Sequence, residues 1–147
     1  MTPDDILAAA RAELGTPFRH QGRIPGKSLD CAGLAIATAA RLGIPYIDRP
    51  GYSRMPSDGI LECTLDDQPA LVRADSMQPG DILLMRFTGD PQHLAFYTGY
   101  SPVYQAEGII HALFQGSRKN SRVCEHILSD DWRSRIVRVY RFTGVES

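Results

Sequence analysis

The sequence has few cysteines, and they do not form a disulfide framework or a zinc-binding motif. Cys31, Cys63 and Cys124 are an odd-numbered set without close spacing. At least one thiol therefore stays free under any pairing scheme. The pattern predicts neither a structural disulfide network nor a zinc site of the CxxC type.

Long hydrophobic runs are also missing. The longest, residues 35–40, is interrupted by Thr38 and is far too short to span a bilayer. Residues 1–5 are acidic and lack the basic and apolar regions of a signal peptide. These absences predict no membrane insertion. They also predict a chain made in the cytoplasm, for which any export uses another route.

Charge of one sign is not in excess either. The 16 basic and 17 acidic residues give a net charge of −1, which argues against a nucleic-acid partner. A length of 147 residues with 43% hydrophobic residues is typical of one globular domain, here residues 1–147.

The order of the expected elements favours an α+β fold. Helices are predicted over residues 2–14, 30–42 and 57–65, the first with Thr2 and Asp5 as a capping box. The remaining chain reads as strands joined by turns, at residues 71–72, 82–87, 92–100, 103–105, 108–114, 123–128 and 136–142. Helices followed by consecutive strands predict helices packed on an antiparallel sheet.

The second helix begins at the most informative stretch, Asp30-Cys31-Ala32-Gly33-Leu34. Unpaired N–H groups and the dipole of a helix N-terminus favour the thiolate form of Cys31, which is the nucleophilic form. Ser28 or Asp30 is expected to cap the helix. Cys31 on its own is equally compatible with a small buried side chain.

Two of the four histidines lie on neighbouring predicted strands. His93 begins one strand and His111 lies inside Gly108-Ile109-Ile110-His111-Ala112. If the two strands pair, the histidines meet on one sheet face. If the helix of Cys31 packs on that face, a thiol, a base and an orienting group converge, as nucleophilic catalysis requires.

Four motifs in order resemble those of NlpC-type peptidases, the papain-like cysteine hydrolases that cleave the peptide stems of bacterial cell wall. They are Gly15-Thr16-Pro17-Phe18, Asp30-Cys31-Ala32-Gly33-Leu34, Gln92-His93-Leu94-Ala95-Phe96-Tyr97 and Ile110-His111-Ala112. The resemblance implies a papain-like sheet of about five to six strands. It also implies Cys31 as nucleophile, His93 as base, His111 as orienting residue, and no cofactor.

The sequence departs from the family pattern near the first motif. Phe18 stands where the family usually has a tyrosine whose hydroxyl assists the oxyanion, and His20 replaces an aromatic residue. Phe18, His20 and Asp30 are the expected substrate-binding residues. The implied reaction is hydrolysis of a stem-peptide amide, with the γ-D-glutamyl–diamino-acid bond expected.

A single domain with a long loop at residues 44–56 looks most like family members of phage tails and gene transfer agents. The resemblance therefore implies tail proteins as partners and a place in a virion or tail-like particle. Three alternatives stay open. They are an inactive structural tail protein, a papain-like amidase or acyltransferase acting on another substrate, and a metal site formed by Cys31, His93 and His111.

Overall fold

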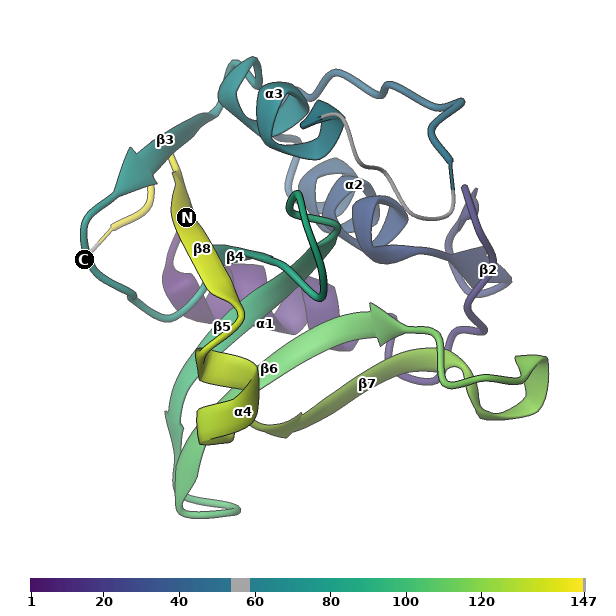
Figure 1. Ribbon diagram of the computed structural model, residues 1–147. Coiled ribbons are helices and arrows are strands. Elements are labelled where there is room, and N and C mark those ends of the chain that lie inside the picture. Colours follow the sequence, from purple (N-terminus) through teal and green to yellow (C-terminus); the bar gives the residue numbers. More distant parts are fainter. Residues whose placement is uncertain (54–58, 147) are drawn as a thin grey trace.

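The computed structural model describes residues 1–53 and 59–146. Within these residues the predicted α+β class is confirmed (Figure 1). The sheet has six antiparallel strands in the order β3-β8-β4-β5-β6-β7, and a separate two-stranded sheet pairs β1 with β2. The elements are α1 (Pro3–Arg11), β1 (Arg23–Ile24), β2 (Ser28–Leu29), α2 (Cys31–Arg41), α3 (Ile60–Asp66), β3 (Leu71–Ala74), β4 (Ile82–Met85), β5 (His93–Ser101), β6 (Ala106–Leu113), η1 (Arg118–Asn120), β7 (Arg122–Ile127), α4 (Asp130–Arg133) and β8 (Ile136–Phe142).

The first helix begins as the sequence predicts but ends earlier. Thr2 and Asp5 form the expected capping box, in which each side chain accepts from the other residue's backbone N–H. The helix ends at Arg11, and the chain turns before Gly15, whose φ of 89° suits glycine. The cap thus fixes where α1 starts, and the turn leads the chain towards the site.

The sheet is completed by its last strand. β8 lies between β3 and β4, so residues 136–142 pair with two segments that precede them by more than 50 positions. Arg141 on β8 forms a two-pronged ion pair with the buried Asp81, which directly precedes β4, at 2.8 and 2.9 Å. This pairing fixes the register of the strands that form one wall of the site.

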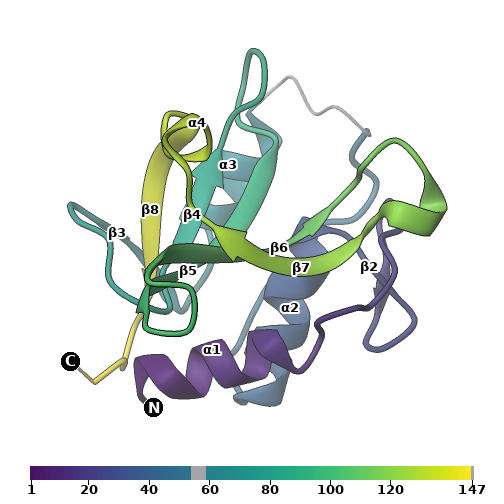
Figure 2. The same ribbon diagram turned by 90° about the horizontal axis from the view of Figure 1, so that it is seen from below.

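The two faces of the sheet are covered by different elements (Figure 2). Alternating residues of β5 and β6, such as Leu94, Phe96 and Ile110, pack in the hydrophobic cluster that includes α1 and α2. The intervening residues, such as Ala95 and Ile109, belong to a second cluster against which Trp132 of α4 packs. The sheet therefore separates two cores.

Three details differ from the sequence prediction. Residues 103–105 lie in the turn between β5 and β6 and form no strand. The short helix α4, capped by Ser129, was not predicted. The helix expected over residues 57–65 spans Ile60–Asp66, and the first two residues of the expected range lie outside the described residues. In residues 1–53 and 59–146, no helix is long and apolar enough to cross a membrane.

Candidate active site

Cys31 is the first residue of α2, as predicted, and Asp30 caps this helix. The Asp30 carboxylate accepts a hydrogen bond of 2.7 Å from the Gly33 N–H. The same carboxylate accepts from Arg23 at 2.8 Å, from the Gln21 N–H at 2.9 Å and from the Tyr52 hydroxyl. Four donors match the number of lone-pair sites of a carboxylate, which favours the capping role over contact with a substrate.

The structure does not give Cys31 the lowered thiol pKa that its place at a helix N-terminus predicts. Burial, together with the neighbouring Asp30 carboxylate, raises the pKa of the Cys31 thiol to about 12. The backbone N–H groups of Leu94 and Ala32 act in the opposite direction but do not compensate. Removal of the thiol from water therefore outweighs the helix N-terminus, and Cys31 rests as a neutral thiol.

His93 and His111 meet as predicted. The Nε2 atom of His93 and the Nδ1 atom of His111 lie 2.7 Å apart, and both side chains are buried. Burial, together with the charge of neighbouring histidines, lowers the pKa of His93 to about 3 and that of His111 to about 2. Both rings are accordingly neutral near pH 7.

A third histidine, His126 on β7, extends this pair. Its Nε2 atom lies 2.7 Å from Nε2 of His111, and its Nδ1 atom lies 2.9 Å from the carbonyl oxygen of Ile127. A carbonyl only accepts, so Nδ1 of His126 carries the proton. With His93 and His111 neutral, Nε2 of His111 then donates to Nε2 of His126, and Nε2 of His93 donates to Nδ1 of His111. This assignment leaves the Nδ1 atom of His93 as a free base, the form that a nucleophilic thiol requires.

Cys31 approaches the histidines in a different way from the one predicted. The histidines share the sheet face of Ala95 and Ile109, whereas the body of α2 packs on the opposite face. Only the start of α2 reaches the site, where the Cys31 thiol lies beside the Leu94 backbone N–H. Among the described residues, no hydrogen bond joins this thiol to His93, so nucleophile and base share a pocket without being paired. Such pairs often tighten only with substrate present.

The pocket that contains these residues has a volume of about 480 Å³ and a largely apolar lining. Cys31 and His93 both line it, as do the predicted substrate-binding residues Phe18, His20 and Asp30. The structure therefore brings all of the predicted site residues except His111 to one cavity wall. His111 is fully buried behind His93.

Phe18 and His20 occupy fixed positions at this pocket. The Phe18 ring packs on Phe114, with centroids 5.9 Å apart. The Nε2 atom of His20 lies 3.0 Å from the Tyr52 carbonyl oxygen, to which it donates. His20 is half-buried, and its Nε2 proton is used in this hydrogen bond.

Sequence reasoning missed two residues of the site, His126 and Trp132. The centroid of the Trp132 ring lies 5.0 Å from that of His111, 5.6 Å from that of His126 and 6.1 Å from that of His93. Trp132 thus covers the row of three histidines. One signal in the sequence could have indicated His126. Cys124 and His126 are two residues apart on a predicted strand, so they share a face, and this strand follows the strand of His111. The alternative metal set of Cys31, His93 and His111 is not brought together. The candidate ligands that meet in the described residues are His111, Cys124 and His126.

Because the Cys31 thiol has a raised pKa, its alkylation is expected to depend steeply on pH. The thiolate fraction rises about tenfold per pH unit below the pKa, so the rate with iodoacetamide should rise similarly from about pH 7 to about pH 10. Mass spectrometry of peptides gives this rate for Cys31 separately from the exposed Cys63. A plateau that begins below about pH 7 would instead show a preformed thiolate–imidazolium pair.

Comparisons with known proteins identify the family and the fold of this chain. The sequence profile of the NlpC/P60 family matches residues 15–141. The NlpC/p60 domain of the peptidoglycan hydrolase SagA has the same fold, with a TM-score of 0.62 at 19% identity, covering 96% of this chain and 99% of that one. This match confirms the papain-like part of the predicted fold.

Two further structures match over part of their length. A lipoprotein-like protein of the NLP/P60 family from Staphylococcus aureus has a TM-score of 0.60 at 20% identity, covering 99% of this chain and 42% of that one. NlpC1 from Trichomonas vaginalis has a TM-score of 0.60 at 19% identity, covering 92% of this chain and 43% of that one. The chain thus spans less than half of these two proteins. A comparison with curated protein sequences gave no significant match. From the profile match over most of its length, the chain belongs to the NlpC/P60 family.

Proposed function

We propose that this protein is a cysteine peptidase that hydrolyses peptide-stem amide bonds of bacterial peptidoglycan. The observation that carries the proposal is the shared pocket of Cys31 and His93, with His111 bonded behind the base. A nucleophile, a base with a free Nδ1 atom and an orienting ring are the parts that acyl transfer through a thioester needs. Family membership and the fold shared with a peptidoglycan hydrolase support the choice of substrate.

In the proposed reaction, Nδ1 of His93 takes the Cys31 proton as the thiolate attacks the amide carbonyl carbon. The oxyanion is stabilised by the Cys31 N–H, which lies in the first turn of α2 where helix N–H groups lack intrahelical partners. His93 then protonates the leaving amine, and water hydrolyses the thioester. Because both resting groups are neutral, the proton moves during the attack, and no preformed ion pair is involved.

The bond that we propose is the γ-D-glutamyl–diamino-acid bond. Digestion of purified sacculi with the protein tests this choice, because hydrolysis there leaves a new free amine on the diamino acid. Mass spectrometry of the released fragments identifies the cut. If the fragments result from cleavage at another stem bond, the proposed bond is wrong but the proposed peptidase activity stands. Absence of any released fragment at an enzyme concentration that saturates the sacculi would contradict the peptidase itself.

A structural protein that has lost activity is the second candidate, and Phe18 favours it. A phenyl ring cannot donate to an oxyanion as the family's usual tyrosine does. The Phe18 ring is nevertheless at the pocket, packed on Phe114. The sacculus digest separates the two candidates, and lipid or small amide substrates in the same assay address a papain-like amidase or acyltransferase.

We further propose that the protein acts in a phage-tail or gene-transfer-agent particle and opens the wall locally. The support is the resemblance of a domain with a long loop at residues 44–56 to that subset. Mass spectrometry of density-purified particles from the source cells tests this role. Recovery of the protein with tail proteins supports it, whereas recovery only outside particles contradicts it and leaves the peptidase proposal intact.

A further inference from the structure

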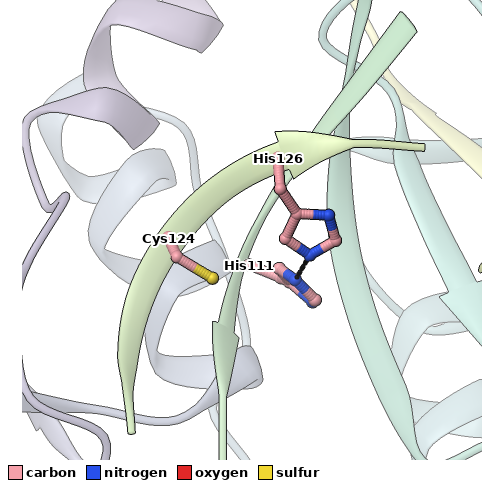
Figure 3. Close-up of side chains that lie close together, drawn as sticks. All are labelled: His111, Cys124 and His126. Atoms are coloured by element: carbon pink, nitrogen blue, oxygen red, sulfur yellow. Dashed lines mark hydrogen bonds between the residues drawn. The ribbon is translucent and has the colours of Figure 1, made fainter. Parts of the chain in front are cut away.

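Three potential metal ligands meet on one face of the β6–β7 pair (Figure 3). His111 on β6 lies directly opposite Cys124 on β7, and His126 follows two residues later on the same strand. Alternate residues of a strand share a face, so the three side chains project to the same side. Their ligand atoms lie within 4.8 Å of one another.

The chemistry of these three atoms is specific. Two imidazole nitrogens and one thiolate sulfur are the ligands of zinc and similar transition metals, whereas calcium and magnesium take oxygen ligands. Bond lengths of about 2.1 Å to nitrogen and about 2.3 Å to sulfur place tetrahedral ligand atoms about 3.5 Å from one another. The two imidazole nitrogens, now 2.7 Å apart, must therefore separate, and a sulfur atom up to 4.8 Å from them must approach by about 1 Å. Rotation of the half-buried Cys124 and His126 side chains supplies such a movement.

Both imidazoles already have the outer partners that a metal ligand needs. Metal-bound histidines usually donate their second ring N–H to a carbonyl, a carboxylate or another acceptor. Nδ1 of His126 already donates to the Ile127 carbonyl oxygen at 2.9 Å, so the lone pair that would coordinate the ion is on Nε2, where it now accepts from His111. His111 has Nε2 on the metal side and Nδ1 2.7 Å from Nε2 of His93.

We propose that His111, Cys124 and His126 bind one divalent transition metal ion of the zinc class, and that the bound ion prevents His93 from acting as a base. The first half stands on the geometry of β6 and β7 alone. The second half rests on the proposed function of His93.

The inhibition follows from the tautomers of the histidine row. Coordination through Nε2 places the His111 proton on Nδ1, from which it is donated to Nε2 of His93. A neutral His93 must then carry its own proton on Nδ1, the atom proposed above to accept the Cys31 proton. The lone pair that would accept the Cys31 proton is lost, although Cys31 itself is untouched.

Metal binding is tested with cobalt(II) in the Cys31→Ala/Cys63→Ser protein. In that protein Cys124 is the remaining thiol, because the chain has three cysteines. We expect one cobalt ion per chain, a thiolate-to-cobalt absorption band in the near ultraviolet, and quenching of Trp132, the single tryptophan. Adding Cys124→Ser should remove the band and weaken binding at least tenfold, and adding His126→Gln should also weaken it. A missing band, or a band that survives Cys124→Ser, overturns the site.

The effect on His93 is tested without an activity assay. Histidine ¹⁵N NMR spectra distinguish a protonated from an unprotonated ring nitrogen. On saturation with zinc, the His93 proton should move from Nε2 to Nδ1, and the Cys124→Ser variant should show no such change at the same zinc concentration. A His93 proton that stays on Nε2 in the zinc-bound protein overturns the inhibitory half.

The sacculus digest gives the third measurement. Zinc should inhibit the wild-type protein, a chelator should reverse the inhibition, and Cys124→Ser should keep the basal rate while needing at least tenfold more zinc for inhibition. Inhibition that is equally strong in Cys124→Ser points to zinc on Cys31 and overturns the inhibitory half. If chelator-treated protein shows no digestion at all, the proposed function fails. In that case the cobalt and NMR measurements still decide the metal site.

Discussion

Replacing Cys31 by serine is expected to reduce the release of fragments from sacculi by about 10³-fold or more, because the weaker hydroxyl nucleophile replaces the thiol. The side chain changes by one atom in a half-buried position, so the fold and the thermal unfolding midpoint should stay close to those of the wild type. The measurement is the initial rate of soluble fragment release. The matched control is Cys63→Ser, an exposed thiol that should have no effect.

A double variant sharpens this test. If Cys31 and His93 act as one unit, Cys31→Ser with His93→Ala should lose no more activity than Cys31→Ser alone. If the two residues contributed independently, the fold-losses in rate of the two single variants would instead multiply in the double variant. A Cys31→Ser protein that keeps more than about a tenth of the wild-type rate would contradict covalent catalysis by this thiol.

Gly33→Ala is expected to destabilise the folded state by about 3 kcal/mol or more, through overpacking against backbone. A Cβ atom added at Gly33 would lie 2.1 Å from the Gly22 carbonyl oxygen, so α2 and the segment before β1 would have to move apart. The glycine of the Asp-Cys-Ala-Gly motif therefore allows the start of α2 to lie directly against the chain. Thermal and denaturant unfolding of the purified variant measure the loss.

The matched control is Gly15→Ala. Gly15 has a φ of 89°, but an added Cβ would meet no atom within 4 Å, so only the backbone strain is introduced. That strain costs about 1 kcal/mol. Equal losses in the two variants would show that close contact with Gly22 is not what makes Gly33 necessary.

The sequence was sufficient for the parts of the fold that are set locally. The caps at Thr2 and Asp30, and the strand at 136–142, follow from residue types and spacing, and the structure has them. The insertion of β8 between β3 and β4 was not predictable, because it depends on which distant strands pair and not on the pattern within any of them.

The site shows the same division. The order and types of Cys31, His93 and His111 were readable, and the meeting of the two histidines is confirmed. The sequence did not indicate on which face of the sheet the histidines meet, because a shift of the strand register by one residue moves every side chain to the other face. The raised pKa of Cys31 was also missed. Burial can only be known once the surrounding chain is in place, and here it outweighs the helix N-terminus that the sequence displays.

The position of β8 has a consequence for synthesis. Ile82 of β4 and Phe142 of β8 both line the pocket, so part of its lining comes from a strand that is synthesised more than 50 residues after β4. Until residues 136–142 emerge, β3 and β4 have unpaired edges and the pocket lacks that wall. Pairings between such distant segments also form slowly. A nascent chain therefore cannot complete the pocket before residues 136–142 have emerged, and chains that stall or are cut before β8 should lack this wall and associate through the open edges.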